Sequence, residues 1–342
     1  MKNFLSFIIL CMLILAGCQK NSPSPTIEEP ETRTGPIKGL ELTFIASPIS
    51  STPLNIIFFL DENTGYIGGY KGVLYKSTNG GNSWIQLVTN TDVQLNDIFF
   101  FNQAEGFAVG GESGALILQT KDGGQTWKKL TFHPSARKEL NSICFPTDSI
   151  GFAVGFGIIL STKDRGNSWK EIKIDSSIEN LLDVKFLNDQ KGLIGCSFGK
   201  LLKTTDGGKH WTISSPFPAT YNHTLAMVNE NTIYSAGHSL FEKSTDFGTT
   251  WSTLNLGCPD DIFKIIFTSE KVGYAFGRGQ YSGGDWGHYY GSIFYTTNGG
   301  VTWEGSDKIS DKGLIRSASF PTPHVGFALS GNNVIRIKPL KN

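Results

Sequence analysis

The sequence has few cysteines and no excess charge of either sign. Its five cysteines include Cys11 and Cys18 near the N-terminus, so only Cys144, Cys196 and Cys258 remain in the body of the chain. Three thiols cannot all pair within one chain, which excludes a disulfide framework. The 30 basic residues balance the 30 acidic residues. This balance argues against a basic surface for nucleic acid, so we expect no nucleic-acid partner.

Motifs for metal or phosphate chemistry are also missing. The six histidines are scattered, and no His/Cys/Asp spacing resembles a zinc site. The sequence shows no phosphate-binding loop before a helix, no nucleophilic serine elbow and no histidine partner for a catalytic thiol. We therefore expect no metal and no cofactor. Little helix is predicted anywhere.

Glycine and aromatic residues are abundant, and many of them belong to six copies of the motif Ser/Thr-x-Asp/Asn-x-Gly-x-x-Trp. The tryptophans that end the copies are 43, 42, 42, 40 and 52 residues apart. Such a fixed period indicates a repeat architecture. The acidic or amide residues and the tryptophans of the six copies are Asn79 and Trp84, Asp122 and Trp127, Asp164 and Trp169, Asp206 and Trp211, Asp246 and Trp251, and Asn298 and Trp303.

Each copy has a structural explanation as a hairpin turn. The Asp or Asn side chain can bond the backbone two residues on, and glycine accepts the positive φ that follows. The Ser/Thr hydroxyl satisfies another amide of the turn, and the tryptophan buries a large area. We therefore interpret all six as structural.

Around each motif lie four short runs rich in aromatic and β-branched residues, bounded by Gly, Asn or Asp. These runs predict strands, and four antiparallel strands in about 42 residues match one propeller blade. Six units are complete. A seventh begins at Ile315 and stops before a fourth strand, whereas residues 40–45 form an unassigned strand. Donating it would close the ring and remove two open edges. We predict an all-β, seven-bladed propeller over residues 39–340.

The N-terminus resembles a bacterial lipoprotein signal. An apolar run follows Lys2 and ends in Leu15-Ala16-Gly17-Cys18, a lipobox with Cys18 as the lipid acceptor. An ordinary secretory peptide is the alternative. The expected domains are a signal peptide over residues 1–17 and a Pro-rich tether over residues 18–38. Gln19 after the acceptor implies the outer membrane of the bacterial envelope, by the family rule.

The repeat Gly-Phe/Tyr-Ala-Val-Gly…Thr-x-Asp-Gly-Gly-x-Thr-Trp resembles the photosystem II stability/assembly factor family, within the wider Asp-box (BNR) class. The resemblance covers roughly residues 40–338. It implies a propeller that binds a protein partner during assembly or stabilisation of a complex. Asp-box propellers also include sialidases and xyloglucan hydrolases, and the fold does not decide among them. Their binding sites use the face opposite the motifs.

Two consecutive positions of each first strand are predicted to surround the central channel. They are Asn55 and Ile56, Asn96 and Asp97, Asn141 and Ser142, Leu182 and Asp183, His223 and Thr224, Phe263 and Lys264, and Arg316 and Ser317. A water-filled channel explains most of the polar members. Asp97, Asp183, Lys264 and Arg316 are the members we select as candidates.

One connection is exceptionally long, that between the second and third strands of the sixth unit. Residues 277–291 account for the 52-residue spacing and contain Trp286, the one tryptophan outside a motif. Aromatic residues mixed with arginine are typical of interface anchors, although the loop could instead pack over its own blade. The predicted contact residues are Arg278, Tyr281, Asp285, Trp286, His288, Tyr289 and Tyr290, with Arg137, Arg316 and Lys264 nearby.

Two functions remain from these residues. The first is a non-enzymatic, membrane-anchored propeller that binds an envelope or surface protein. The alternative is a glycan-binding protein, glycoside hydrolase or sialidase-like protein using the same face. A glycosidase needs two facing carboxylates, for which Asp97 and Asp183 are the candidates. The arginine motif that opens sialidase domains is absent.

Overall fold

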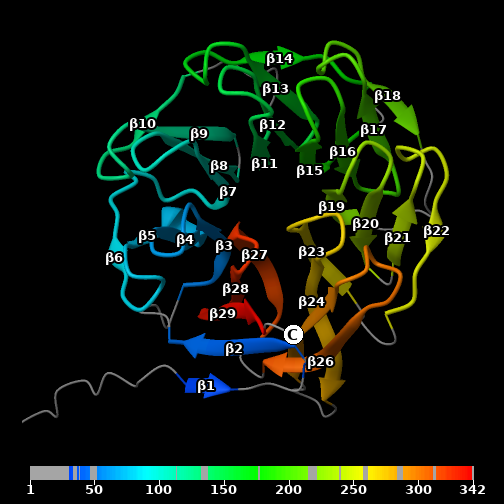
Figure 1. The fold of residues 1–342 in the computed structure, drawn as a ribbon. Coiled ribbons are helices and arrows are strands. Elements are labelled where there is room, and N and C mark those ends of the chain that lie inside the picture. The colour runs from blue at the N-terminus through cyan, green and yellow to red at the C-terminus, as the bar shows by residue number, and fades with distance from the viewer. Residues whose placement is uncertain are drawn as a thin grey trace, which may run out of the picture.

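The computed structural model describes residues 31–33, 37, 39–46, 52–112, 114–131, 138–175, 178–214, 222–238, 240–256, 261–282, 288–310 and 313–340. Its strands form seven antiparallel sheets arranged as blades around a central axis (Figure 1). The predicted seven-bladed all-β propeller is confirmed. Cys18 and the predicted signal peptide over residues 1–17 lie outside the described residues. Within the described part of the chain, no helix has the length and apolar character to span a membrane.

Blades 1 to 3 follow one another along the chain, and the first strand of each lies nearest the axis (Figure 1). Their strands, from the axis outward, are β3 (Leu54–Phe59), β4 (Gly65–Gly69), β5 (Leu74–Ser77) and β6 (Ile85–Gln86); β7 (Leu95–Phe100), β8 (Gly106–Gly111), β9 (Ala115–Thr120) and β10 (Lys128–Lys129); and β11 (Leu140–Cys144), β12 (Gly151–Gly155), β13 (Ile158–Thr162) and β14 (Lys170–Ile172). A short 3-10 helix, η1 (Tyr70–Gly72), connects β4 to β5.

Blades 4 to 6 repeat this order. Their strands are β15 (Leu181–Phe186), β16 (Gly192–Cys196), β17 (Leu201–Thr204) and β18 (Thr212–Ser214); β19 (Asn222–Met227), β20 (Ile233–Gly237), β21 (Leu240–Ser244) and β22 (Ser252–Thr253); and β23 (Asp261–Phe267), β24 (Gly273–Ser282), β25 (His288–Thr296) and β26 (Glu304–Ser310). The last three are the long strands of the sixth blade.

Blade 7 joins the two ends of the chain. Its sheet has the order β27 (Ile315–Thr322), β28 (Val325–Ser330), β29 (Asn333–Pro339), β2 (Leu40–Ile45) and β1 (Glu31–Arg33). Leu42 of β2 pairs with Ile337 of β29, which confirms the predicted closure by an N-terminal strand. Strand β1 was not predicted, because residues 31–33 fell inside the Pro-rich segment assigned to the tether.

The core consists of aromatic stacks between neighbouring blades. In six of the seven blades an aromatic residue of the second strand stacks on the Phe of the next blade, as Tyr66 does on Phe100 at 4.2 Å and Phe327 on Phe59 at 3.5 Å between ring centroids. In five blades a glycine opens the second strand and is required by this packing, since a Cβ on Gly106 would lie 2.5 Å from the Phe100 ring. Between blades 4 and 5 the cluster is mainly aliphatic, with Leu193 and Met227.

The six Asp-boxes form the hairpin turns between third and fourth strands. In the second box Thr120 Oγ1 accepts the Gly124 amide at 2.8 Å and donates to Asp122 at 2.8 Å. Asp122 in turn accepts the amide of Thr126 at 2.8 Å. The carboxylate therefore caps the amide four residues on, not two as the sequence suggested. Gly124 has a φ of +88°. The structural interpretation of the boxes is consistent with this network.

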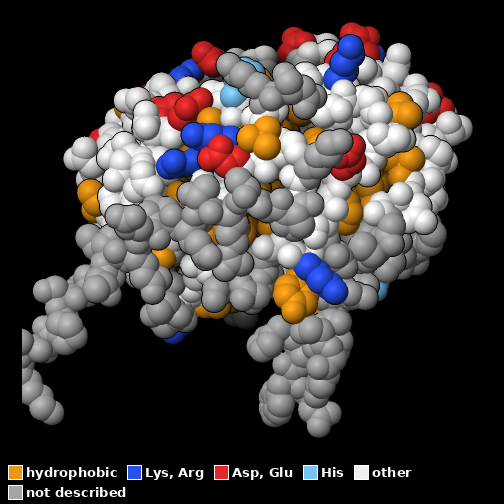
Figure 2. Space-filling view, turned by 60° about the horizontal axis from the view of Figure 1, so that its bottom comes forward, with side chains coloured by type: hydrophobic (Ala, Val, Ile, Leu, Met, Phe, Trp, Pro, Cys, Tyr) orange, Lys and Arg blue, Asp and Glu red, His pale blue; other side chains and the backbone are white. Residues whose placement is uncertain are grey.

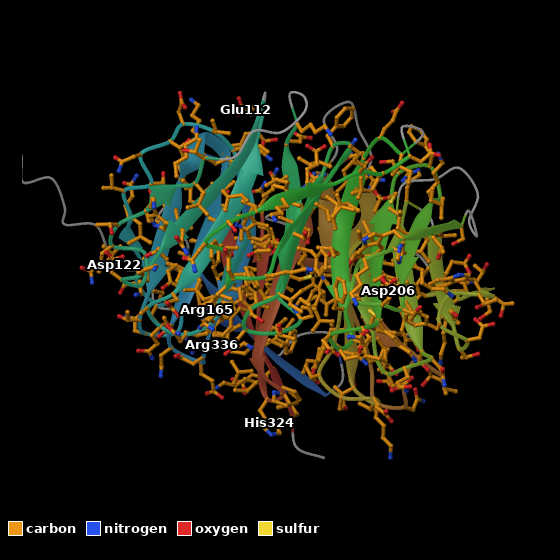
Figure 3. All side chains as sticks on the ribbon, turned by 90° about the horizontal axis from the view of Figure 1, so that it is seen from above. Glu112, Asp122, Arg165, Asp206, His324 and Arg336 are labelled. Carbon is orange, nitrogen blue, oxygen red and sulfur yellow. The ribbon has the colours of Figure 1, made fainter. Side chains whose placement is uncertain are left out.

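The boxes and the second-to-third-strand connections lie on opposite faces, which we call the box face and the loop face. Figure 3 shows Glu112, in the connection from β8 to β9, at one edge and His324, in the turn from β27 to β28, at the other. Each first strand therefore begins at the loop face. Figure 2 shows acidic and basic side chains lying close together on the visible side, without a large field of one sign.

Candidate functional site

A β-bulge opens the first strand of all seven blades. In blade 2, for example, Leu95 pairs with Gly110 and Asp97 with Val109, so that Asn96 is skipped. A bulge turns two consecutive side chains to the same side of a strand. This explains why two adjacent positions of each first strand face the axis. The skipped residues are Asn55, Asn96, Asn141, Leu182, His223, Phe263 and Arg316.

These side chains surround a small cavity of about 100 Å³ at the loop-face end of the axis. It is lined by Asn55, Ile56, Asn96, Asp97, Asn141, Ser142, Leu182, Asp183, Thr224, Phe263, Lys264, Arg316 and Ser317. The structure thus brings the predicted channel residues together, including the selected candidates Asp97, Asp183, Lys264 and Arg316. His223 is placed by its backbone alone.

The polar residues of this ring link neighbouring first strands. Each first strand is the inner edge of its sheet, so part of its backbone lacks a ladder partner. Asp97 accepts the Ile143 amide of the next blade at 2.9 Å. The same bond joins Asp183 to Leu225 (2.9 Å), Ser317 to Ile57 (3.2 Å), Thr224 to Ile265 (3.3 Å) and Ser142 to Val184 (3.5 Å). A water-filled channel is therefore not the main reason for the polar ring.

A second set of bonds, which we call the asparagine ladder, runs through blades 1 to 3. The side-chain amide of Asn96 donates to the Leu140 carbonyl at 2.8 Å, and Asn141 donates to the Leu181 carbonyl at 2.8 Å. With its amide oxygen and nitrogen exchanged, Asn55 makes the same bond to Leu95 at 3.1 Å. In blades 4 to 7 the equivalent positions hold Leu182, His223, Phe263 and Arg316. None of these residues has a side-chain amide group.

Four charged groups share the axis. Burial raises the pKa of Asp97 against the opposing effect of Lys264 and Lys185. Burial also acts to raise the pKa of Asp183, but the charges of Lys185 and Lys264 outweigh it, so that the pKa is lowered. Burial, together with the Lys185 charge, lowers the pKa of Lys264. Cys144, beside this group, has a pKa raised by burial to about 12 and is a neutral, unreactive thiol.

The arrangement of Asp97 and Asp183 does not resemble a free pair of catalytic carboxylates. Asp97 accepts the amides of Ile98 and Ile143, both at 2.9 Å. Asp183 accepts the Leu225 amide and an ammonium hydrogen of Lys185 at 2.5 Å. Oxygens held in this way join blades and offer little room for a sugar or a water nucleophile. Among the described residues no group of three or more His, Cys, Asp or Glu side chains could hold a metal ion.

An ion cluster lies on blades 5 and 6 at the loop face. Asp261, at the start of β23, is bonded by Arg278 at 2.7 Å and by the ring of His238 at 2.6 Å. The Arg278 guanidinium also lies over the Tyr289 ring, 4.4 Å from its centroid. The Asp261 side chain is 7% exposed and that of His238 is 59% exposed, so the cluster extends from the blade to solvent.

The predicted long loop is in large part a β-hairpin. Strands β24 and β25 continue past the other blades, and Tyr281 pairs with Tyr289 and Ser282 with His288. The sequence pattern predicts a long connecting loop here, without strands. Tyr289 and Tyr290 are half-buried, whereas Tyr281 and His288 are placed by backbone alone. Asp285, Trp286 and Arg137 lie outside the described residues.

Arg316 lines the axial cavity and lies against blade 6. Its guanidinium lies over the Phe263 ring at 5.1 Å from the centroid, and its side chain is exposed. Phe263 is two residues from Asp261 on β23, and β23 packs against β27. We define the blade 6–7 surface as Phe263, Lys264, Arg278, Tyr289 and Arg316. Sequence reasoning missed Asp261, His238 and Lys185, although Lys185 follows Asp183 at the two-residue spacing of a strand face.

The fold and the Asp-boxes define the class, a BNR-type β-propeller. Residues 82–180 match the family model described as "Photosynthesis system II assembly factor YCF48", which confirms the resemblance to the photosystem II assembly factor family. No curated protein sequence matches the chain.

Solved structures share the fold at low sequence identity. A structure described as "YCF48 bound to D1 peptide" is 18% identical, with a TM-score of 0.70, over 94% of this chain and 100% of that chain. YCF48 from Cyanidioschyzon merolae is 17% identical, with a TM-score of 0.68, over 87% and 98%. The GH74 enzyme of Niastella koreensis is 17% identical, with a TM-score of 0.64, over 84% of this chain and 53% of that enzyme.

Proposed function

We propose that this chain is a non-enzymatic propeller that binds a protein partner at the blade 6–7 surface and aids assembly or stability of an envelope complex. The observation that carries the proposal is the interruption of the asparagine ladder. Where blades 1 to 3 use the bulge position to bond the next blade, blades 6 and 7 place Phe263 and Arg316 there. A YCF48 structure described as bound to a D1 peptide supports protein binding as the function.

The chemistry of the surface indicates what it binds. Phe263, Tyr289 and two arginines combine apolar area with fixed cationic groups, a mixture enriched in the energetic centres of protein interfaces. The guanidinium groups lie over aromatic rings, which limits the rotamer entropy lost on binding. We propose a partner segment with apolar side chains and at least one carboxylate.

We further propose that Cys18 carries the lipid and that residues 19–30 tether the propeller to the outer membrane. Support comes from the Leu15-Ala16-Gly17-Cys18 sequence, with Gln19 after the acceptor. Metabolic labelling with a palmitate analogue tests this, since Cys18→Ala abolishes labelling if Cys18 is the acceptor. Labelling that persists in this variant contradicts the anchor.

The partner is identified by crosslinking in native cells. Wild type is compared with Arg316→Glu and Tyr289→Ala, and with Lys121→Glu as a matched charge reversal in a box. We expect a discrete envelope protein that crosslinks to wild type and Lys121→Glu and is lost from both surface variants. A partner retained by Arg316→Glu and Tyr289→Ala contradicts the proposed surface, and the absence of any protein partner contradicts the function.

Glycan cleavage is the alternative, although backbone amides hold both axial carboxylates. The pKa of Asp97 is raised and that of Asp183 is lowered, a separation found in acid and base pairs. Glycan hydrolysis by purified protein that disappears in both Asp97→Asn and Asp183→Asn, and survives Tyr289→Ala, would establish it in place of protein binding.

A further inference from the structure

The box of one blade is held by side chains of the preceding blade. Tyr66 Oη and Lys76 Nζ both donate to the Gly123 carbonyl of the second box, at 3.1 and 2.9 Å. Tyr234 and Lys243 donate in the same way to the Gly299 carbonyl of the sixth box, at 2.7 and 3.0 Å. The two donors are paired across the second and third strands in each case. A box turn is thus the natural occupant of the notch between two blades at the box face.

The notch between blades 6 and 7 has a pair of side chains at the donor positions, Tyr274 and Tyr295, which are paired across β24 and β25, but no box. Tyr295 Oη donates to Glu304 at 3.4 Å, so Tyr274 is the donor that would meet a box. Blade 7 takes its fourth strand from the N-terminus, so no hairpin turn connects its third and fourth strands. Among the described residues, Tyr274 Oη has no hydrogen-bond partner, although the side chain is fully buried. Burial raises the pKa of Tyr274 to about 12, so the hydroxyl keeps its proton.

A cavity of about 550 Å³ occupies this notch. Its lining includes Tyr274, Val272, Thr268, Glu304, His324 and Leu340, which is 49% exposed. Figure 3 places His324 at the box-face edge. A cavity of similar volume lies between blades 3 and 4, where a box is present. Cavity volume therefore does not distinguish the blade 6–7 notch from the cavity between blades 3 and 4. The distinguishing feature is the buried Tyr274 hydroxyl, which has no acceptor among the described residues.

We propose that the blade 6–7 notch binds a β-turn of a partner protein that imitates an Asp-box. Tyr274 is 0% exposed in the free chain, so the turn displaces the residues that cover it. The backbone carbonyl of the turn then accepts the hydrogen bond of Tyr274 Oη, which satisfies a buried donor that otherwise reduces stability. An aromatic side chain of the turn packs edge-on near Tyr274 and Phe320, as Trp303 packs against Tyr234 and Phe267. Ile37 and Leu40 already cover part of this cluster, so the occupant is a single turn and not a whole blade. This site is separate from the loop face and independent of the function proposed there.

The probe is a fluorescein-labelled cyclic hairpin peptide with the sequence of residues 118–130, the second box of this chain. Its binding to the full chain is followed by fluorescence anisotropy. We expect saturable binding that weakens roughly five- to tenfold in Tyr274→Phe, which loses one hydrogen bond. Tyr234→Phe is the matched control, because its hydroxyl already bonds the sixth box, and it keeps wild-type affinity. A peptide with Ala in place of the box tryptophan should bind more weakly.

Tyr274→Phe removes a hydroxyl that bonds none of the described residues, so this variant folds at least as well as wild type and a loss of binding cannot be attributed to unfolding. No binding to wild type, or equal affinity for wild type and Tyr274→Phe, overturns the proposal. A peptide that binds equally well with the tryptophan replaced overturns the aromatic part of it.

Discussion

Blades 1 to 3 and blades 5 to 7 are built from the same repeat, yet they use equivalent positions for different purposes. In blades 1 to 3 the bulge residue is asparagine, and its amide bonds the next blade. In blades 6 and 7 the same position holds Phe263 and Arg316, and the sixth blade extends a hairpin beyond the ring. The bulge position therefore stabilises the ring in blades 1 to 3 and is available for binding a partner in blades 6 and 7.

The largest difference should appear when an aromatic side chain is removed from each region. Phe107 is 1% exposed and stacks between blades 2 and 3 on Phe145, so Phe107→Ala should lower the free energy of unfolding by about 3–5 kcal/mol. Phe263 is only half-buried at the loop face, and Phe263→Ala should cost about 1 kcal/mol while reducing partner crosslinking. Urea unfolding measures both. Equal losses of stability in Phe107→Ala and Phe263→Ala would contradict the distinction between the packed side of the ring and the blade 6–7 surface.

The two axial aspartates should respond in opposite ways to pH. Asp183→Asn leaves Lys185 without its partner and should cost about 1–3 kcal/mol at neutral pH. Because the pKa of Asp183 is lowered by folding, this cost shrinks as pH falls through that folded value. The pKa of Asp97 is raised, so ionised Asp97 destabilises the fold. Asp97→Asn should therefore gain stability relative to wild type as pH rises above about 4.

Thermal unfolding between pH 3 and 7 tests both slopes. Asp122, whose pKa is also lowered by hydrogen bonds to Thr126, serves as a reference, and Asp122→Asn should follow the direction of Asp183→Asn. Parallel pH profiles for Asp97→Asn and Asp183→Asn contradict the assigned pKa directions.

A smaller effect separates the tyrosines of blades 1 and 6. Tyr66→Phe loses the bond to the Gly123 carbonyl and should reduce stability by about 0.5–1.5 kcal/mol. Tyr274→Phe removes a buried hydroxyl that has no acceptor among the described residues and should be neutral or stabilising. Chemical denaturation of the two variants side by side provides the measurement. A clear loss of stability in Tyr274→Phe would show that its hydroxyl is already satisfied.

The smallest expected effect on stability comes from giving blade 7 the bulge residue of blades 1 to 3. Arg316→Asn places an amide at the bulge position of blade 7 and should extend the asparagine ladder to blade 1, with a gain of at most about 1 kcal/mol. The same variant should lose partner crosslinking, which is the exchange of function for stability seen at many binding sites. Asn96→Ala is the converse control and should lose about 1 kcal/mol without loss of partner. Full partner binding by Arg316→Asn contradicts the assignment of Arg316.

Much of the fold could be predicted from the sequence because each blade repeats the same local signals. The Gly after each first-strand Phe and the box before each Trp located the strands, and the missing fourth strand of blade 7 indicated the closure by residues 40–45. The channel residues followed from alternation along the first strand. The bulge could not be predicted, since it is a matter of pairing between strands, and with it the reason for two adjacent axial positions.

The parts that sequence did not reveal depend on contacts between distant residues. Asp261 is identified as a site residue by its contacts with Arg278 and His238, which the sequence does not show. The polar ring was attributed to water because the unpaired inner edge of a neighbouring blade is not visible in one repeat. The long hairpin of blade 6 resembled a loop because its glycines and aromatic residues do not alternate. Tyr274 resembled its counterparts, and only the absent box makes it different.

The pairing of β2 with β29 also determines when folding can be completed. Leu42 pairs with Ile337. One of the first strands to be synthesised therefore remains unpaired until one of the last has been made. Contacts so far apart in sequence form slowly, since the chain entropy of closing the whole ring is lost before they form. Until then the nascent ring has two unpaired edges, which can pair with other chains. A chain truncated before β29 would keep six blades and still have no means of closing them.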